Sequence, residues 1–504
     1  MSAATTLIYQ LLGKTGSTWV SADELRTEAW KRGIVFDNIL NDKNVVEYEG
    51  YYTTKKINIE EDRVAINVIR LLLCAPPVKH SDCEIESLIC KFEETQNEGR
   101  KLHFHQKDAV KMIVNNNFCV LTGGAGTGKT TVLSCAVFVL RELNKKTRIV
   151  FTAPTGKAAR RITESTKEYA STVHKKFGIT LEGKEPIPLE EDTLFIDESS
   201  MNDNEISSII VSACATGKRI VMVGDVYQLL SVGLGAVLRD LIDSGIIPVT
   251  QLTHTFRQSN DSVLFKNITN IRNGCNEIIE GDDYHAIRLP DGCNQELEEM
   301  AFKLLKEKYV EQVKKWGVEN VVLLLPYRRK GVCSNRLNNM VQRIVNRKEK
   351  GFGHFKKNEN IKFWFCVDDY VMQLENRDEC ANGDVGQVVK VDDTGIDVSF
   401  VDGIVHYNPE ELDQLSLAYA MSIHKSQGSE YNSVIMALLE EHTCMLQRNM
   451  LYTGVTRGKK EVTLIYQQKA YDIAVSTLAD KSRKTMLKEK LLAVYARYRM
   501  VYGI

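Results

Sequence analysis

The chain has 504 residues, which is the length of roughly three or four domains, and 43% hydrophobic with 26% charged residues is typical of a soluble globular protein. The formal net charge of −1 excludes a global basic field, so any nucleic-acid site has to be a local groove. No apolar run approaches the ~20 residues of a membrane span, so no membrane association is expected.

Residues 1–100 are typical of a separate accessory domain. The first ten residues lack a charged region followed by an apolar core, so no secretory signal is expected. Residues 7–12 predict a short helix, Ser21 predicts the start of a second helix with Glu24 at the capping-box position, and residues 44–54 predict a hairpin. Helix, helix and hairpin indicate a winged-helix-like module. Such a module binds DNA or docks a protein partner, and the sequence leaves both open.

The twelve cysteines are scattered, and none forms a Cys-x-x-Cys pair. Cys83 and Cys90 near His80 are the best metal candidate, but their spacing fits no known module. We therefore expect free thiols and a reducing, cytoplasmic compartment.

The most informative segment predicts a phosphate-binding loop between a strand and a helix. An apolar run at 118–121 precedes it, and apolar residues at helical spacing follow it to residue 143. Glycines let backbone N–H groups curl around a triphosphate, and a helix N-terminus adds a positive field. The loop consists of Gly123, Gly124, Ala125, Gly126, Thr127, Gly128, Lys129, Thr130 and Thr131. Lys129 would reach the β and γ phosphates and Thr130 would ligate magnesium, so ATP binding and hydrolysis are expected.

Four strand-like runs at 118–121, 148–152, 193–196 and 219–223 alternate with helix-like material, which predicts a parallel sheet. The third run ends in Asp197 and Glu198. At that position the first acid suits the magnesium shell and the second suits orienting and deprotonating the attacking water. The fourth run ends in Gly224-Asp225, and the amide of Gln228 in the next loop can contact both the γ-phosphate and the water.

A second set of runs at 320–325, 415–420, 433–437 and 462–466 predicts a second α/β lobe. Between its first two strands, at about 356–414, short alternating strands with Asn-Gly, Thr-Gly and Asp-Gly turns predict a small antiparallel barrel or sheet. Residues 481–500 predict a basic amphipathic helix, which we assign to the second lobe at 256–504.

The order of these blocks resembles superfamily 1 helicases, and within them the RecD-like branch of group B. As they stand in this chain, the matching blocks are His105-Gln106, the phosphate loop, Thr152-Ala-Pro-Thr-Gly-Lys-Ala-Ala159, Ser171-Thr-Val-His174, Asp197-Glu-Ser-Ser-Met201, Gly224-Asp-Val-Tyr-Gln228, Phe256-Arg-Gln258, Ser422-Ile-His-Lys-Ser-Gln-Gly-Ser-Glu430 and Tyr452-Thr-Gly-Val-Thr-Arg457.

The resemblance implies an α/β fold of two RecA-like parallel-sheet lobes, a small β-barrel insert in the second lobe and a small α+β N-terminal domain. The first lobe would comprise residues 101–255, with a pin-like hairpin at 178–192. ATP and Mg²⁺ would bind between the lobes. Gln106 would read adenine, and Gly428 and Glu430 would also line the nucleotide. The implied catalytic residues are Lys129, Asp197, Glu198, Gln228, Arg257 and Arg457, with Thr130 and Asp197 on the metal.

The resemblance also implies translocation from 5′ to 3′ on single-stranded DNA and unwinding of duplex junctions in repair, recombination or replication. Separately, we expect a monomer. Short polar or cationic groups suit phosphate contacts, and the expected strand contacts are Pro154, Thr155, Lys157, Thr172, His174, His424 and Ser426. The alternative is an ATPase switch that docks a nuclease or replication complex through the N-terminal module.

One motif departs from the family pattern. The chain has Gln228-Leu-Leu-Ser-Val232, where the family usually has proline at the position of Leu230. Without that proline we expect a softer loop between the γ-phosphate and DNA.

Deleting residues 181–186 should spare DNA-stimulated ATP hydrolysis and lower duplex unwinding, because a hairpin pin splits the duplex without touching ATP. Parallel ATPase and strand-displacement assays check this expectation. Equal loss of both activities would show that the segment is not a pin.

Overall fold

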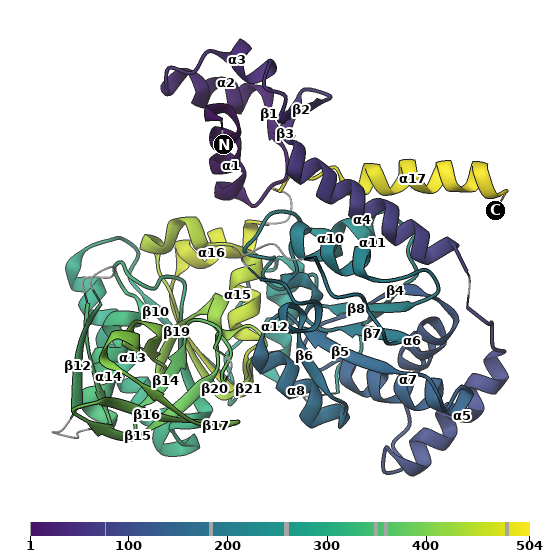
Figure 1. Ribbon diagram of the computed structural model, residues 1–504. Coiled ribbons are helices and arrows are strands. Elements are labelled where there is room, and N and C mark those ends of the chain that lie inside the picture. The colour runs from purple at the N-terminus through teal and green to yellow at the C-terminus, as the bar shows by residue number, and fades with distance from the viewer. Residues whose placement is uncertain are drawn as a thin grey trace. The chain divides into compact units, whose positions relative to one another are not determined.

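A computed structural model describes residues 2–75, 77–180, 185–256, 262–346, 351–356, 361–377, 379–478 and 483–503. The chain forms two compact units (Figure 1). The first comprises Met1–Pro154, Ala159–Phe256 and Ala479–Ile504, and the second comprises Thr155–Ala158 and Arg257–Leu478. Within the described ranges, no helix has both the length and the apolar character to cross a membrane.

The first unit begins with a small α+β module. Its elements are α1 (Ala3–Thr15), β1 (Val20–Ser21), α2 (Ala22–Lys31), α3 (Phe36–Leu40), β2 (Val45–Tyr48) and β3 (Tyr51–Thr54), and its sheet has the order β1-β3-β2. The Ser21 side chain accepts a hydrogen bond from the Glu24 N–H and so caps α2. Leu7, Ile8 and Leu25 lie in its apolar core. The predicted order of helix, helix and hairpin is confirmed.

The core of the first unit is a six-stranded parallel sheet of order β6-β5-β7-β8-β4-β9. The four predicted strands are present as β4 (Phe118–Gly123), β5 (Ile149–Ala153), β7 (Thr193–Ile196) and β8 (Arg219–Gly224). The short edge strands β6 (Ala170–Thr172) and β9 (Val249–Leu252) were not predicted. The turn of the expected pin at 178–192 falls on residues 181–184, outside the described residues.

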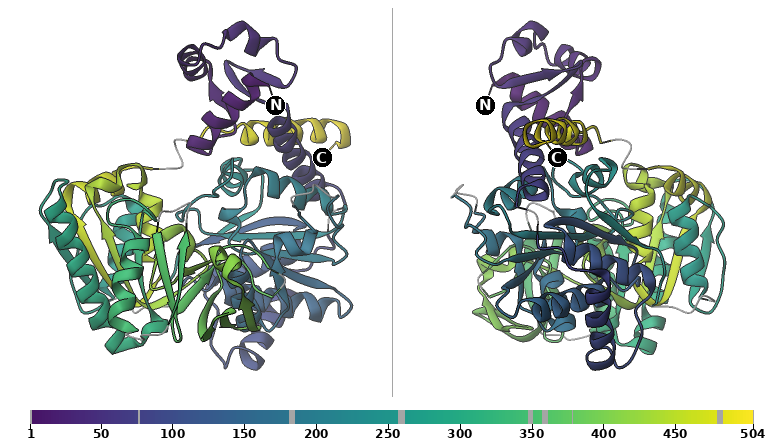
Figure 2. Two further views of the ribbon diagram at one scale, coloured as in Figure 1. Left: turned by 60° about the vertical axis from the view of Figure 1, so that its left-hand side comes forward. Right: turned by 90° about the vertical axis from the view of Figure 1, so that its right-hand side faces the viewer.

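Helices surround this sheet on both faces (Figure 2). They are α4 (Lys55–Leu73), α5 (Asp82–Thr95), α6 (Phe104–Asn115), α7 (Lys129–Leu143), α8 (Gly156–Thr166), α9 (Val173–Phe177), α10 (Asn204–Ala213) and α11 (Val237–Asp243), with a single 3₁₀ turn η1 (Ser199–Met201) after β7.

The C-terminal helix belongs to the first unit, which corrects the assignment of residues 481–500 to the second lobe. Helix α17 (Leu487–Tyr502) packs across α4 and also contacts α11 (Figures 1 and 2). Leu487 and Leu491, one helical turn apart, are buried in the same core as Val64 and Val68 of α4. The amphipathic pattern predicts a helix with an apolar face, but it does not indicate which part of the protein packs against that face.

The second unit contains a five-stranded parallel sheet of order β10-β21-β20-β11-β19. Its strands are β10 (Tyr284–Leu289), β11 (Val321–Leu325), β19 (Ala420–Ser422), β20 (Tyr431–Leu438) and β21 (Gly458–Gln467). Its helices are α12 (Val263–Asn273), α13 (Gln295–Trp316), α14 (Ser334–Val345), α15 (Arg448–Val455) and α16 (Gln468–Ser476), with 3₁₀ turns η2 (Val318–Asn320), η4 (Ile423–Ser426) and η5 (Glu440–Met445). The sheet confirms the predicted second α/β lobe.

The predicted strand at 415–420 is in fact two strands with different partners. β18 (Leu415–Leu417) pairs antiparallel with β14 (Tyr370–Gln373), whereas β19 pairs parallel with β11. β18 is therefore an edge strand of an antiparallel insert of order β17-β16-β15-β14-β18. The insert also contains β15 (Val385–Asp392), β16 (Gly395–Phe400) and β17 (Gly403–Tyr407), with the 3₁₀ turn η3 (Pro409–Gln414) before β18. A hairpin of β12 (Gly351–Lys356) and β13 (Ile361–Cys366) precedes it.

Replacing Leu491 by alanine should destabilise the first unit by about 2–5 kcal/mol, because the change leaves a cavity against α4. Its neighbour Leu492 is 40% exposed, so Leu492→Ala is the matched control and should cost no more than about 0.5 kcal/mol. Urea unfolding followed by circular dichroism measures both, and equal costs would contradict the docked position of α17.

Candidate nucleotide-binding site

The phosphate loop lies between a fully buried strand and a helix, as predicted. β4 ends at Gly123 and α7 begins at Lys129. Gly126 and Gly128 have φ of +76° and +79°, where glycine is favoured. A Cβ at Gly128 would also collide with the Nε2 of Gln106. Gly128 caps α7 without any side-chain hydrogen bond, so the first-turn amides of α7 are suited to a phosphate.

Lys129 is held over this loop by its own backbone. Its Nζ donates to the carbonyl oxygens of Gly123 at 2.7 Å and Gly124 at 3.0 Å. The Thr127 hydroxyl donates to the same Gly124 oxygen at 2.9 Å. The ammonium is therefore positioned at the mouth of the loop, where phosphate oxygens can replace the carbonyls as its acceptors.

Gln106 is buried against the phosphate loop. Its Oε1 accepts the His103 N–H at 3.0 Å, and its Nε2 donates to the Thr127 carbonyl at 3.4 Å. The side chain therefore links the first turn of α6 to the loop. This position suits a residue that responds to a nucleotide bound at the phosphate loop. The contact of Gln106 with adenine remains a prediction.

An aromatic cluster beside Gln106 was missed at the level of sequence. The rings of His103 and His254 stack with centroids 4.8 Å apart, and Phe256 packs edge-on against His254 at 4.7 Å. The Phe256 N–H donates to the Gly126 carbonyl at 2.8 Å, which ties the cluster to the phosphate loop. Phe104 and Phe256 are 60% and 49% exposed. Exposed rings next to a phosphate loop suit stacking on a purine.

The two acids follow β7 at the same sheet edge. The Asp197 N–H donates to the Thr152 carbonyl, and the Asp197 Oδ1 accepts the Glu198 N–H at 2.8 Å. Burial and the charge of Glu198 raise the pKa of Asp197 to about 6, against the attraction of Lys129. Glu198 has φ of +50°, a left-handed conformation that costs a non-glycine residue about 1–3 kcal/mol. Strain of this kind at an acid is typical of a catalytic position.

The donor set at this edge fits magnesium. The Asp197 carboxylate and the Thr130 hydroxyl are oxygen ligands of the kind that Mg²⁺ prefers, and Mg²⁺ usually takes the rest of its shell from phosphates and water. β7 and β4 both pair in parallel with β8, so Asp197 and the phosphate loop follow strands that end at the same edge of the sheet. The charged acid would be stabilised by a cation that replaces its lost hydration.

Gln228 is buried in the turn after β8. Its backbone N–H donates to the Asp225 carbonyl at 3.2 Å, and its Nε2 lies 3.4 Å from Asp225 Oδ2. Asp225 is itself buried and accepts the Tyr227 N–H at 3.0 Å. Because β7, β8 and β4 are neighbours in a parallel sheet, their carboxyl ends bring the acids, Gln228 and the phosphate loop to one edge.

In the second unit, Arg457 is 3% exposed. It donates to the Thr453 carbonyl at 3.0 Å and to the Ser429 carbonyl at 3.3 Å. Ser429 lies between two other predicted nucleotide contacts: Gly428, with φ of +72°, and Glu430, which pairs with Lys459 at 3.3 Å. Arg457 therefore contacts the short segment that carries Gly428 and Glu430. Arg257 lies outside the described residues.

Two expected strand contacts lie close together in sequence at the edge of the first unit. Thr172 caps α9, because its hydroxyl accepts the Lys175 N–H at 3.2 Å. His174 in the first turn of α9 is exposed. The half-buried Pro154 follows β5, the strand next to β6. These residues remain predicted contacts.

The other expected strand contacts differ in accessibility. Ser426 is buried and its hydroxyl donates to the Ile423 carbonyl at 2.7 Å, so it is not offered to a ligand. Lys157 lies with its Nζ 5.1 Å from the Tyr431 ring centroid, a cation–π distance. Thr155 and His424 are half-buried.

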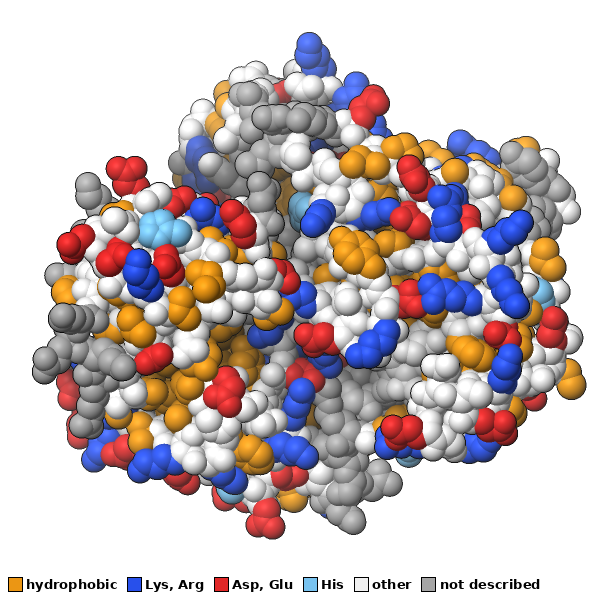
Figure 3. All heavy atoms as spheres, turned by 60° about the horizontal axis from the view of Figure 1, so that its bottom comes forward, with side chains coloured by type: hydrophobic (Ala, Val, Ile, Leu, Met, Phe, Trp, Pro, Cys, Tyr) orange, Lys and Arg blue, Asp and Glu red, His pale blue; other side chains and the backbone are white. Residues whose placement is uncertain are grey.

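The surface carries both signs of charge close together. On the face drawn in Figure 3, Lys and Arg side chains are interspersed with Asp and Glu. This pattern agrees with the net charge of −1 and with a strand-binding site made of local groups.

Replacing Gly128 by alanine should weaken nucleotide binding at least about tenfold, because the new Cβ both strains the left-handed turn and displaces Gln106. Gly245 also has a left-handed φ, +68°, but nothing lies within 4 Å of its added Cβ. Gly245→Ala is therefore the matched control for backbone strain alone. Titration with a fluorescent ATP analogue measures both variants, and equal affinities would contradict the assigned cradle.

Comparison with known proteins agrees with this site. Residues 106–234 match the AAA domain family, and residues 417–465 match the UvrD-like helicase C-terminal domain family. The chain is 29% identical over 448 residues to the ATP-dependent RecD2 DNA helicase of Deinococcus radiodurans, covering 86% of this chain and 58% of that protein. It is 28% identical to the RecBCD enzyme subunit RecD of Haemophilus influenzae, covering 73% and 70% of the two chains.

A solved structure of Pif1 helicases at forked duplex DNA is similar at 19% identity and a TM-score of 0.46, over 80% of this chain and 98% of that one. That likeness is too distant to bear on function. The chain spans only 58% of the length of the Deinococcus relative. The two curated relatives nevertheless confirm the resemblance drawn from the ordered motifs, and the chain is a homologue of the RecD-like helicases of superfamily 1.

Proposed function

We propose that this protein is an ATP-driven DNA helicase that translocates on single-stranded DNA and opens duplex junctions. The observation that carries the proposal is the meeting of the phosphate loop, the Asp197–Glu198 pair and the Gln228 turn at one sheet edge. Nucleotide binding alone requires only the phosphate loop. Hydrolysis also requires groups that orient and deprotonate the attacking water, and Glu198 and Gln228 are suited to these tasks.

In this proposal each group has a separate task. Lys129 and the N-terminus of α7 bind the β and γ phosphates, and Glu198 accepts a proton from the water that attacks the γ-phosphorus. Gln228 orients that water. Thr130 and Asp197 would hold magnesium, whose charge neutralises phosphate oxygens.

Hydrolysis becomes movement only if the second unit responds to the γ-phosphate. We assign that role to Arg457 and Arg257, because a guanidinium can hold phosphate oxygens with two parallel hydrogen bonds. Arg457 donates a hydrogen bond to the carbonyl of Ser429, which lies between Gly428 and Glu430. Alternating grip by the two units would then ratchet the strand, with Pro154, Thr155, Lys157, Thr172, His174 and His424 as phosphate contacts. Movement from 5′ to 3′ follows from the family resemblance.

The N-terminal module is the proposed site for a duplex junction or a protein partner. Its helix α2 presents Trp30 at 83% exposure and Figure 1 shows the module standing clear of the sheet of its own unit. We also propose that the protein acts as a monomer in the cytoplasm. Twelve free cysteines, several of them exposed, suit a reducing compartment.

Single-stranded DNA should raise ATP turnover many-fold in the wild-type protein, because a motor couples strand binding to hydrolysis. Lys129→Ala should abolish turnover with and without DNA, since the phosphates lose their principal cation. A coupled-enzyme ATPase assay with and without an oligonucleotide measures both. An ATP turnover rate that does not change when the oligonucleotide is added would favour the alternative, an ATPase switch that docks a partner.

A strand-displacement assay with 5′- and 3′-tailed duplexes tests the direction of movement. Opening of only the 3′-tailed duplex would overturn the proposed 5′ to 3′ direction.

A further inference from the structure

The chain returns from the second unit to the first at its C-terminal end. Leu478 is the last residue of the second unit, and residues 483–490 lie in the first. We call residues 483–490 the C-terminal strap. The strap lies beside the loop that follows Gln228 and beside the N-terminal module, so it touches two parts of the first unit that are far apart in sequence.

Arg483 grips the loop after Gln228 with a single guanidinium. Its Nη2 donates to the Ser231 carbonyl at 2.7 Å, and its Nη1 donates to the Gly235 carbonyl at 2.7 Å. The same Nη1 lies 3.2 Å from both the Ser231 hydroxyl and the Gly233 carbonyl. A guanidinium is the side chain suited to this task, because its donors have a fixed planar geometry. Residues 231–235 are thereby fastened at both ends.

The same loop contacts the end of the first helix of the chain. The Gly235 N–H donates to the Gly16 carbonyl at 2.8 Å. Gly16 caps α1 with φ of +74°, and a Cβ there would overlap the Arg483 guanidinium. Glycine at this position therefore lets the N-terminal module, the loop and Arg483 meet.

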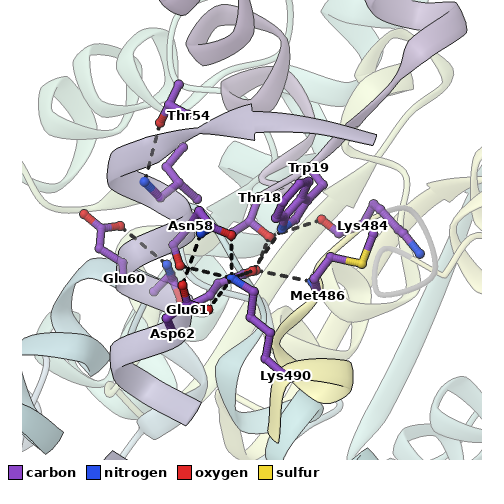
Figure 4. Close-up of polar contacts among 12 residues, drawn as sticks. Thr18, Trp19, Thr54, Asn58, Glu60, Glu61, Asp62, Lys484, Met486 and Lys490 are labelled. Carbon is purple, nitrogen blue, oxygen red and sulfur yellow. Dashed lines mark hydrogen bonds and ion pairs between the residues drawn. The ribbon is translucent and has the colours of Figure 1, made fainter. Parts of the chain in front are cut away.

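The rest of the strap is anchored on a buried acid of α4 (Figure 4). Glu61 is fully buried and accepts hydrogen bonds from the Thr18 hydroxyl at 2.5 Å, the Trp19 Nε1 at 2.9 Å and the Met486 N–H at 3.3 Å. Lys490 completes the cluster with its Nζ 3.3 Å from the Glu61 carboxylate. Because a buried carboxylate with several partners strongly prefers one arrangement, the strap is fixed to the N-terminal module.

The backbone of the strap contributes as well. The Lys484 carbonyl accepts the N–H groups of Thr18 and Trp19 at 2.9 and 3.2 Å, and the Lys484 N–H donates to the Ser17 hydroxyl at 3.0 Å. Arg483 and Lys484 are adjacent, so a shift of the N-terminal module would also move Arg483. This continuity distinguishes the strap from an isolated surface contact.

We propose that Arg483 is a positioning residue for the Gln228 loop, and that the C-terminal strap couples this loop to the N-terminal module. The inference rests on the proposed function, because that function has Gln228 orient the water that attacks the γ-phosphorus. Leu230 stands where proline would stiffen the loop, so this chain needs another restraint there. Arg483 supplies that restraint, and its anchorage makes the restraint sensitive to whatever occupies the module.

The test compares Arg483→Ala and Arg483→Lys with Lys488→Ala, a matched control because Lys488 is exposed in the same strap. Hydrogen–deuterium exchange of the 504-residue protein without nucleotide or DNA measures how well the backbone amides of this loop are protected. In Arg483→Ala, amides in residues 231–235 should exchange roughly tenfold faster. Arg483→Lys should lie between, since an ammonium keeps the charge but loses the fork. Lys488→Ala should match wild type.

The second readout is ATP hydrolysis saturated with single-stranded DNA. Arg483→Ala should lower kcat about tenfold with KM for ATP within about twofold of wild type, because the phosphate loop is untouched. Glu61→Gln, which weakens the anchor, should lower DNA-stimulated kcat in the same direction. A purely structural role would lower the melting temperature and leave the kcat of the folded fraction unchanged.

The two proposals fail separately. Wild-type protein whose turnover ignores DNA would sink the proposed function, and the exchange experiment would still decide the role of Arg483. Unchanged exchange at residues 231–235 in Arg483→Ala overturns the positioning role. A rise in KM with kcat preserved overturns it as well. If Arg483→Ala does not fold, the same two readouts on Arg483→Lys decide the matter.

Discussion

The chemistry of this protein depends on the parallel register of β7, β8 and β4. In a parallel sheet every strand delivers its carboxyl end to the same edge, so three loops far apart in sequence have to meet there. The acids follow β7, the Gln228 turn follows β8 and the phosphate loop follows β4. A shift of one residue in any of these pairings would turn its loop residues to the other face of the sheet. β4 and β7 are buried along their whole length and β8 is buried from Ile220 onward, and this burial disfavours such a shift.

Several energetically unfavourable features meet at the same edge of the sheet, and a bound nucleotide with its cation would relieve the electrostatic ones. Asp197 has lost much of its hydration and faces the charge of Glu198, while Glu198 adopts a left-handed backbone. The Lys129 ammonium donates to two neutral carbonyl oxygens of its own loop. A bound triphosphate with a cation would give the ammonium anionic partners and the carboxylate a positive charge. Relief of these unfavourable interactions on binding would contribute to the affinity of the site for the nucleotide.

Much of the site was predictable because its motifs are local. The glycines of the phosphate loop and the pair Asp197–Glu198 each carry their geometry in a few consecutive residues. The cluster of His103, His254 and Phe256 has no such signature, since its members come from two loops that meet only in the fold. Short edge strands such as β6 were missed because three residues carry no periodicity.

The partner of a helix is equally invisible in sequence. The stripe of Leu487 and Leu491 predicts an apolar face, and only the structure shows that α4 covers it. For the same reason Arg483 gave no signal: its acceptors are backbone carbonyls, which every sequence supplies. Ser426 shows the opposite case. Its motif is easily recognised in the sequence, but in the structure its hydroxyl donates to the Ile423 carbonyl of its own turn.

The route of the chain has a consequence for biosynthesis. The second unit is inserted between the body of the first unit and that unit's closing helix, α17. During synthesis, the part of the apolar side of α4 that α17 covers would stay exposed until α17 has left the ribosome. A chain that ends before residue 483 would therefore keep apolar residues of α4 exposed, and exposed apolar surface favours aggregation and binding by chaperones.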